Sequence, residues 1–229
     1  MRKDGLSTTT PTPPSGRPVR LAVLLSGSGT TLQNFIDCIA GGRLTAEIVL
    51  VLASRADAGG LQRARAAGIA AVAVPRKDFA DVDAFNDALH AELARYEVDL
   101  IILAGFLSPF QLRGRYHGRV LNIHPALIPA FCGKGFYGER VHRAVLEAGV
   151  RVSGCTVHFA DDQYDHGPIV LQGVVPVLDD DTPEALASRV HTLENELYPE
   201  AVRLWAAGRL DVVGRRVRIR PGLVLSAES

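Results

Sequence analysis

The chain has 229 residues, of which 25 are Lys or Arg, 25 are Asp or Glu, and 47% are apolar. This length fits one domain with a short extension, and the apolar share is enough for a large core. Nucleic-acid and membrane surfaces favour a basic excess, so the balanced charge predicts neither kind of partner.

The cysteines and the chain ends indicate a compartment. Cys38, Cys132 and Cys155 have neither disulfide nor metal spacing, which is typical of reduced thiols in a cytoplasm. No apolar stretch approaches the length of a membrane helix, and the N-terminus lacks the apolar segment of a secretory signal. Because residues 5–17 are rich in Thr, Pro, Ser and Gly, we expect a disordered leader at 1–17.

Strand and helix signals alternate in the first half of the chain. Apolar runs typical of strands buried on both faces occur at 19–25, 46–54, 69–75 and 99–106. Apolar residues at helical spacing predict helices at 31–42, 61–68 and 81–96. This alternation predicts a parallel sheet with helices on both faces.

The second half continues the pattern with one change. We expect strands at 119–123, 152–160 and 167–177, and helices at 139–149 and 182–208. Only the short polar stretch DDQYDH separates the last two strands, which predicts an antiparallel hairpin at the sheet edge. The fold class is therefore α/β, with a Rossmann-like, mostly parallel sheet. We place one domain at 18–210 and a peripheral tail at 211–229.

The stretch SGSGTT, residues 26–31, lies between the first strand and the first helix. A loop there presents backbone N–H groups at the positive end of a helix, which suits a phosphate. The lysine of a Walker loop and the third glycine of a dinucleotide loop are both missing, so a phosphate monoester is favoured. A tight turn capped by Thr30 or Thr31 fits the loop alone equally well.

Asn122 and His124 follow each other at a spacing of two at the end of a predicted strand, so their side chains share one face. Ligands of parallel sheets bind at such carboxyl ends. An amide can donate to an oxyanion, and an imidazolium can donate a second hydrogen bond or a proton. A nearby carboxylate would keep the imidazole protonated.

Three aspartates could supply that carboxylate, namely Asp161, Asp162 and Asp165. Asp165 is preferred because it precedes the sharp bend expected at His-Gly-Pro. The alternative is that His124 merely ends a strand and that the aspartates form turns.

Five stretches occur together in this chain, namely LLSGSGTTLQN, LIILAGFLSPF, RVLNIHPALIPAFCGKGFYG, SGCTVHFADDQYDHGPIVLQ and HTLENELYP. In this order they resemble the phosphoribosylglycinamide formyltransferase family of purine biosynthesis, over Arg20 to Leu210. The resemblance implies the formyltransferase fold. It also implies transfer of a formyl group from 10-formyltetrahydrofolate to the amine of glycinamide ribonucleotide, without a metal, by a monomer or homodimer.

The resemblance also implies a role for each matching residue. The roles are catalysis for Asn122, His124 and Asp165; ribonucleotide binding for Gly29, Thr30, Thr31 and Glu194; and folate binding for Leu107, Asn122, Phe159 and Asp165. The chain departs from the family after Phe106, where the segment is shorter and lacks a common arginine. Arg113 and Arg115 are the candidates to replace it.

Other functions remain as alternatives. Formyltetrahydrofolate deformylase shares the Asn-Ile-His strand, but it usually has a second histidine where this chain has Pro125. Methionyl-tRNA formyltransferase needs a large basic C-terminal domain. A non-catalytic folate- or nucleotide-binding protein would not need all three catalytic candidates, and a thiol enzyme would need a partner beside Cys132 or Cys155.

Overall fold

The structure is a computed structural model that describes residues 7–9, 11 and 16–221. Its strands are β1 (Ser7–Thr9), β2 (Val19–Leu25), β3 (Ala46–Ala53), β4 (Ala71–Ala73), β5 (Leu100–Leu103), β6 (Val120–His124), β7 (Val152–Phe159), β8 (Ile169–Pro176), β9 (Leu210–Val213) and β10 (Arg216–Ile219). Its helices are α1 (Thr30–Ala40), α2 (Gly59–Ala66), the short 3-10 helix η1 (Arg76–Asp78), α3 (Val82–Leu93), α4 (Glu139–Glu147) and α5 (Pro183–Ala206).

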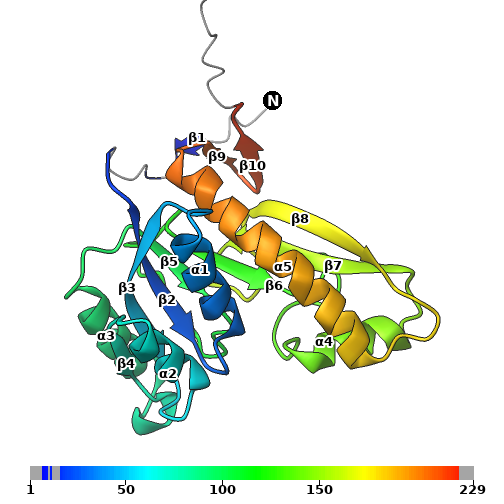
Figure 1. The fold of residues 1–229 in the computed structure, drawn as a ribbon, viewed down its shortest axis with the longest axis horizontal. Coiled ribbons are helices and arrows are strands. Elements are labelled where there is room, and N and C mark those ends of the chain that lie inside the picture. Colours follow the sequence, from blue (N-terminus) through cyan, green and yellow to red (C-terminus); the bar gives the residue numbers. More distant parts are fainter. Residues whose placement is uncertain (1–6, 10, 12–15, 222–229) are drawn as a thin grey trace, which may run out of the picture.

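All strands join one sheet in the order β1-β9-β10-β8-β7-β6-β5-β2-β3-β4 (Figure 1). The strands from β6 to β4 run parallel, which confirms the predicted Rossmann-like half. Because parallel strands end at the same edge of a sheet, the loops after β2, β5 and β6 are neighbours. These three loops carry the glycine stretch, Leu107 and the residues that follow His124.

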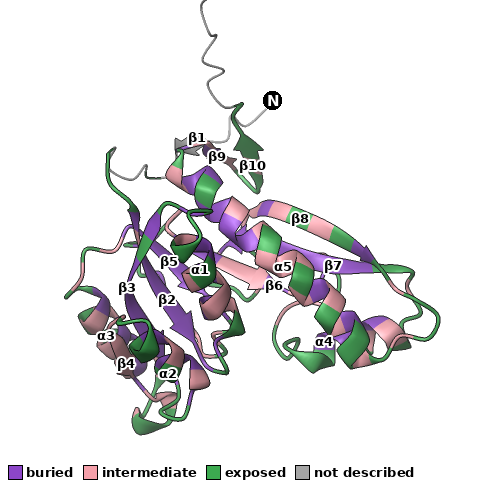
Figure 2. Ribbon diagram, viewed as in Figure 1, coloured by how far each residue is buried: buried purple, intermediate pink, exposed green. Residues whose placement is uncertain are grey.

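The central strand β2 is buried on both faces (Figure 2). Leu21, Val23 and Leu25 belong to a core cluster that includes residues of α1, α2 and α5. Ala22 and Leu24 belong to a cluster with residues of α3 on the other face. Helices therefore cover both faces of the sheet, as the apolar runs predicted.

The hairpin predicted from DDQYDH is present, with β7 antiparallel to both β6 and β8. It is not the outermost pair, because β10 pairs with β8, β9 with β10, and β1 with β9. The tail therefore continues the sheet. Within the expected leader, Ser7–Thr9 pair with β9, a strand whose edge offers backbone groups to another strand. The rest of the expectation for residues 1–6, 10, 12–15 and 222–229 lies outside the described residues.

Helix α5 begins as predicted, with the Thr182 hydroxyl accepting from the N–H of Ala185 at 3.2 Å. Further along, the hydroxyl of the fully buried Tyr198 shares its one proton between the carbonyls of Leu103 at 3.0 Å and Leu121 at 2.8 Å. These bonds attach α5 to β5 and β6, the two strands that lead into the candidate site. Within the described residues, no helix is long and apolar enough to cross a membrane.

Candidate active site

Strand β6 places Asn122 and His124 on the same face, as the spacing predicted. In the pairing with β7, Asn122 lies opposite His158 and His124 lies opposite Thr156. Asn122 is half-buried, whereas His124 is only 3% exposed. The pair is therefore held by the middle of the sheet and not by a mobile loop.

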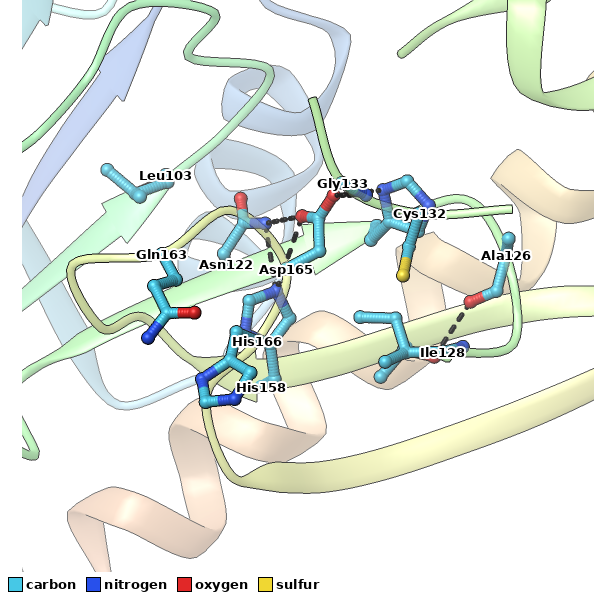
Figure 3. Close-up of polar contacts among 12 residues, drawn as sticks. Leu103, Asn122, Ala126, Ile128, Cys132, Gly133, His158, Gln163, Asp165 and His166 are labelled. Carbon is cyan, nitrogen blue, oxygen red and sulfur yellow. Dashed lines mark hydrogen bonds and ion pairs between the residues drawn. The ribbon is translucent and has the colours of Figure 1, made fainter. Parts of the chain in front are cut away.

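Asp165 reaches this pair from the turn between β7 and β8. Figure 3 shows its carboxylate next to the Asn122 amide. Its Oδ1 accepts from Nδ2 of Asn122 at 3.4 Å, and its Oδ2 lies 3.5 Å from Nδ1 of His124. Oδ2 also accepts from the backbone N–H of Gly133 at 2.9 Å. The structure therefore brings the three predicted catalytic side chains together.

Asp162 and Asp161 face elsewhere. The Asp162 carboxylate accepts from the backbone N–H of Leu112 at 3.1 Å, and Asp161 accepts from His166 at 2.7 Å. Asp165 is thus the member of the three that faces His124.

Both ring nitrogens of His124 are engaged. Nε2 donates to the carbonyl of Phe131 at 2.8 Å, since a carbonyl can only accept, and Nδ1 faces Asp165. Burial lowers the pKa of His124, and this outweighs the opposing effects of the Asp165 charge and the Phe131 carbonyl. The expectation that Asp165 keeps the ring protonated is therefore opposed by burial in the free protein.

Asp165 itself favours the ionised state. Burial raises the pKa of its carboxyl, but interactions with His158, with His124 and with the Gly133 N–H outweigh burial, and the pKa is lowered. Burial therefore opposes protonation of His124, while the neighbours of Asp165 favour its ionised form.

Sequence reasoning missed three neighbours of this site. Nδ1 of His158 lies 2.9 Å from the carbonyl of Phe159 and must donate to it, which leaves Nε2 to accept from Nδ2 of Asn122 at 3.0 Å. Phe131 contributes its carbonyl and Gly133 its N–H. The alternation of residues along β7 is visible in the sequence. The pairing of β6 with β7, which places His158 opposite Asn122, is visible only in the structure.

The glycine loop starts α1 without a side-chain cap. Gly29 is the N-cap with φ +75°, so the alternative of a threonine cap is wrong. A Cβ at Gly29 would lie 2.5 Å from the Cα of Gly60, so a larger residue cannot fit between the glycine loop and α2. Thr30 is exposed and Thr31 is half-buried, and the first N–H groups of a helix have no partner within it. The predicted phosphate site would use such N–H groups.

Ser26 connects the glycine loop to the segment after β5. Its N–H donates to the carbonyl of Gly105 at 3.1 Å, and its hydroxyl accepts from the N–H of Leu107 at 2.9 Å. The Leu107 side chain is 54% exposed. The predicted phosphate and folate segments therefore touch each other at the same sheet edge as β6.

The remaining predicted residues are Glu194, Phe159, Arg113 and Arg115. Glu194 on α5 accepts from Nδ1 of His191 at 3.1 Å, and its charge opposes the lowering of the His124 pKa. Phe159 is 3% exposed and its ring belongs to the core, so a folate contact there would have to use its main chain. Arg113 pairs with Asp87 of α3 and Arg115 stacks over the Tyr116 ring, so neither extends freely as a replacement arginine.

The thiols do not form a second reactive centre. Burial raises the pKa of Cys132, and it raises the pKa of Cys155 to about 12. A thiol is nucleophilic only as its thiolate, so both cysteines are poor nucleophiles at neutral pH. Among the described residues, no group of three or more His, Cys, Asp or Glu side chains is arranged to hold a metal ion.

Comparison with known proteins agrees with this geometry. Residues 19–202 match the model of the formyl transferase family. Phosphoribosylglycinamide formyltransferase of Haemophilus influenzae is 39% identical over 83% of this chain and 89% of its own length. The chloroplastic phosphoribosylglycinamide formyltransferase of Arabidopsis thaliana is 42% identical over 80% of this chain, which spans 64% of that protein's length.

Solved structures give the same result. The crystal structure of glycinamide ribonucleotide transformylase 1 from Symbiobacterium toebii has a TM-score of 0.84 and 45% identity, and the match covers 90% of this chain and 96% of that one. A formyltetrahydrofolate deformylase from Pseudomonas syringae has a TM-score of 0.80 at 21% identity, a likeness of fold alone. The chain belongs to the formyl transferase family and, within it, to the phosphoribosylglycinamide formyltransferases.

Proposed function

We propose that the chain transfers a formyl group from 10-formyltetrahydrofolate to the amine of glycinamide ribonucleotide, a step of purine biosynthesis. The observation that carries the proposal is the meeting of Asn122, His124 and Asp165 at a sheet edge that also holds the glycine loop. A phosphate on that loop would bring a ribonucleotide within reach of the three side chains.

The proposed chemistry begins with attack of the amine on the formyl carbon. Negative charge develops on the formyl oxygen, and donors from Asn122 and His124 stabilise it. The new C–N bond forms as the bond from carbon to the folate nitrogen N10 breaks. The proton lost by the amine passes to N10 through His124 or a water molecule, so no other reactant is needed.

This role requires a rearrangement of two contacts. Nε2 of His124 donates its proton to the Phe131 carbonyl. It therefore has to release this carbonyl before it can donate to the reacting group. One N–H of Asn122 has to leave Asp165, which at 3.4 Å is the longer of its two contacts. Catalytic hydrogen bonds in a substrate-free protein are often long or poorly aligned and tighten only when substrates bind.

The other site residues are proposed to bind substrates. Gly29, Thr30 and Thr31 would hold the phosphate through backbone N–H groups and hydroxyls, and Glu194 would hold the ribonucleotide amine end. Leu107, with Asn122, Asp165 and the main chain of Phe159, would contact the folate. Ser26 supports this arrangement, because it fixes the two binding segments against each other.

The test measures release of tetrahydrofolate from 10-formyltetrahydrofolate with and without glycinamide ribonucleotide. Release that requires the ribonucleotide and yields its formylated product supports transfer. Release at an equal rate in its absence would indicate a deformylase, the alternative with the same fold. A His124→Asn variant is the control, and we expect its rate to fall by about 10²–10⁴-fold.

Three further proposals follow from the same site. We propose that no metal takes part, so that activity survives a chelator. The free thiols suit the cytoplasm, which cell fractionation can test. A monomer or a homodimer is proposed, and light scattering of the purified protein can decide between them.

A further inference from the structure

The turn between β9 and β10 contacts the loop that carries Asp165. Strand β10 lies beside β8, with Arg216 paired to Ile169, so the turn is next to the point where the loop returns to the sheet (Figure 1). There Nη2 of Arg215 donates to the carbonyl of His166 at 2.8 Å, and Nη1 donates to Nε2 of the same residue. One arginine of the tail therefore holds both the main chain and the ring of the residue that follows Asp165.

The contacts continue beyond His166. A guanidinium can only donate, so Nε2 of His166 accepts and its ring proton is on Nδ1. Nδ1 donates to Oδ2 of Asp161 at 2.7 Å, and Oδ1 of Asp161 accepts from the N–H of Gln163 at 2.9 Å. We call Arg215, His166 and Asp161 the latch. It ties the two sides of the loop together around Asp165.

Asp165 needs such support, because its backbone is in the left-handed region at φ +52°. A non-glycine residue there persists only where its surroundings determine the conformation. The loop is also closed tightly at its base, since a Cβ at Gly167 would lie 1.8 Å from the carbonyl oxygen of Phe159. A small relaxation at residue 166 would therefore move the carboxylate of Asp165 relative to His124.

We infer that Arg215 is a positioning residue, which holds the loop so that the Asp165 carboxylate stays against His124. The inference rests on the proposed function, because it assigns Arg215 to the same catalytic set. Arg215 and His166 are exposed, so their contacts contribute little to the stability of the fold. The effect of removing them should appear in catalysis.

The experiment compares Arg215→Ala with Arg218→Ala. Arg218 is on β10, three residues after Arg215, is exposed and carries the same charge, which makes it a matched control. We expect kcat of R215A to fall about three- to tenfold, the loss typical of one or two hydrogen bonds, with KM for the ribonucleotide unchanged. The alkaline limb of its pH–rate profile should move to lower pH, and R218A should match the unsubstituted enzyme.

Two further measurements separate positioning from a loss of folding. Arg215→Lys can still donate to the His166 carbonyl and should recover part of the lost rate. Hydrogen exchange of the peptide covering 160–168 should be faster in R215A than in R218A, at an equal midpoint of thermal unfolding. If R215A does lower that midpoint, His166→Gln serves in its place with the same expected change in pH profile.

The outcomes distinguish the latch from the proposed function. Kinetics of R215A that coincide with R218A at every pH overturn the inference, as does a loss confined to unfolding temperature with normal rates. Full activity in Asp165→Asn would instead contradict the proposed catalytic set. If D165N is inactive and R215A is normal, only the inference about Arg215 is refuted and the proposed catalytic set stands. The hydrogen-exchange measurement tests the latch without any measurement of activity.

Discussion

Replacement of Asp165 by asparagine tests the electrostatics of the site most directly. The substitution removes one charge while keeping the size of the side chain, and asparagine can still accept from Gly133. The charge lies 3.5 Å from Nδ1 of His124, and the two side chains are 11% and 4% exposed. At an effective dielectric constant of about 20, two unit charges at this separation interact by about 5 kcal/mol.

The measurable effect should be smaller than this. The Asp165 charge is shared with the N–H groups of Gly133 and Asn122, and an opposite charge at such distances typically shifts a pKa by about 1–3 units. The charge opposes the effect of burial on His124, so its removal lowers the pKa of the imidazole further. If the protonated ring is the reacting form, the rate at neutral pH falls about tenfold for each unit.

The assay is the pH dependence of kcat for formyl transfer, measured for Asp165→Asn and for Asp179→Asn. Asp179 is an exposed residue between β8 and α5, and its replacement applies the same charge change outside the site. We expect the alkaline limb of D165N to move down by about 1–3 pH units and that of D179N to stay in place. An alkaline limb in D165N at its original pH would refute the coupling between Asp165 and His124.

Two other predictions follow from the structure. Gly29→Ala should destabilise the protein by about 1–3 kcal/mol in urea unfolding and raise KM for the ribonucleotide, because its Cβ has no space and its φ is positive. Gly27→Ala, which has neither problem, should cost less than Gly29→Ala in both assays. The free energy of unfolding should also fall as the pH drops below about 6.5. Buried imidazoles have a lower pKa in the folded protein than in the unfolded chain, so the unfolded chain binds more protons in this range. The histidines whose pKa burial lowers in this way are His90, His124 and His142. A urea midpoint that is constant from neutral pH to below pH 6 would contradict this reasoning.

The sequence predicted the parallel half of the fold well because buried strands are continuous apolar runs, as at 19–25. It did not predict β1, and for the tail it predicted no more than a peripheral position. Ser7–Thr9 has no apolar residue, and in Arg216–Ile219 the alternation of arginine with Val217 and Ile219 covers only four residues. Both segments join the sheet through backbone pairing with an edge strand. Pairing of that kind depends on tertiary structure and leaves little trace in the residues.

The candidate site shows the same division. The shared face of Asn122 and His124 follows from the two-residue period of a strand, and Asp165 from the bend beside it. The partner His158 and the charge state of His124 do not follow from the sequence. The first depends on the register between β6 and β7, and the second on how completely the segment around Phe131 covers the ring.

Burial of His124 has two effects on the site: it lowers the pKa of the ring, and it strengthens charge interactions with the ring. Burial lowers the pKa of the ring, which makes its proton easier to give up. The same exclusion of water strengthens every charge interaction in the site. In the proposed transfer, negative charge on the formyl oxygen next to Nε2 would add to the fixed charge of Asp165 at Nδ1, and the two together would favour the imidazolium against burial. The pKa of the ring would then rise as the oxyanion forms, and the position of Asp165 determines the size of that rise.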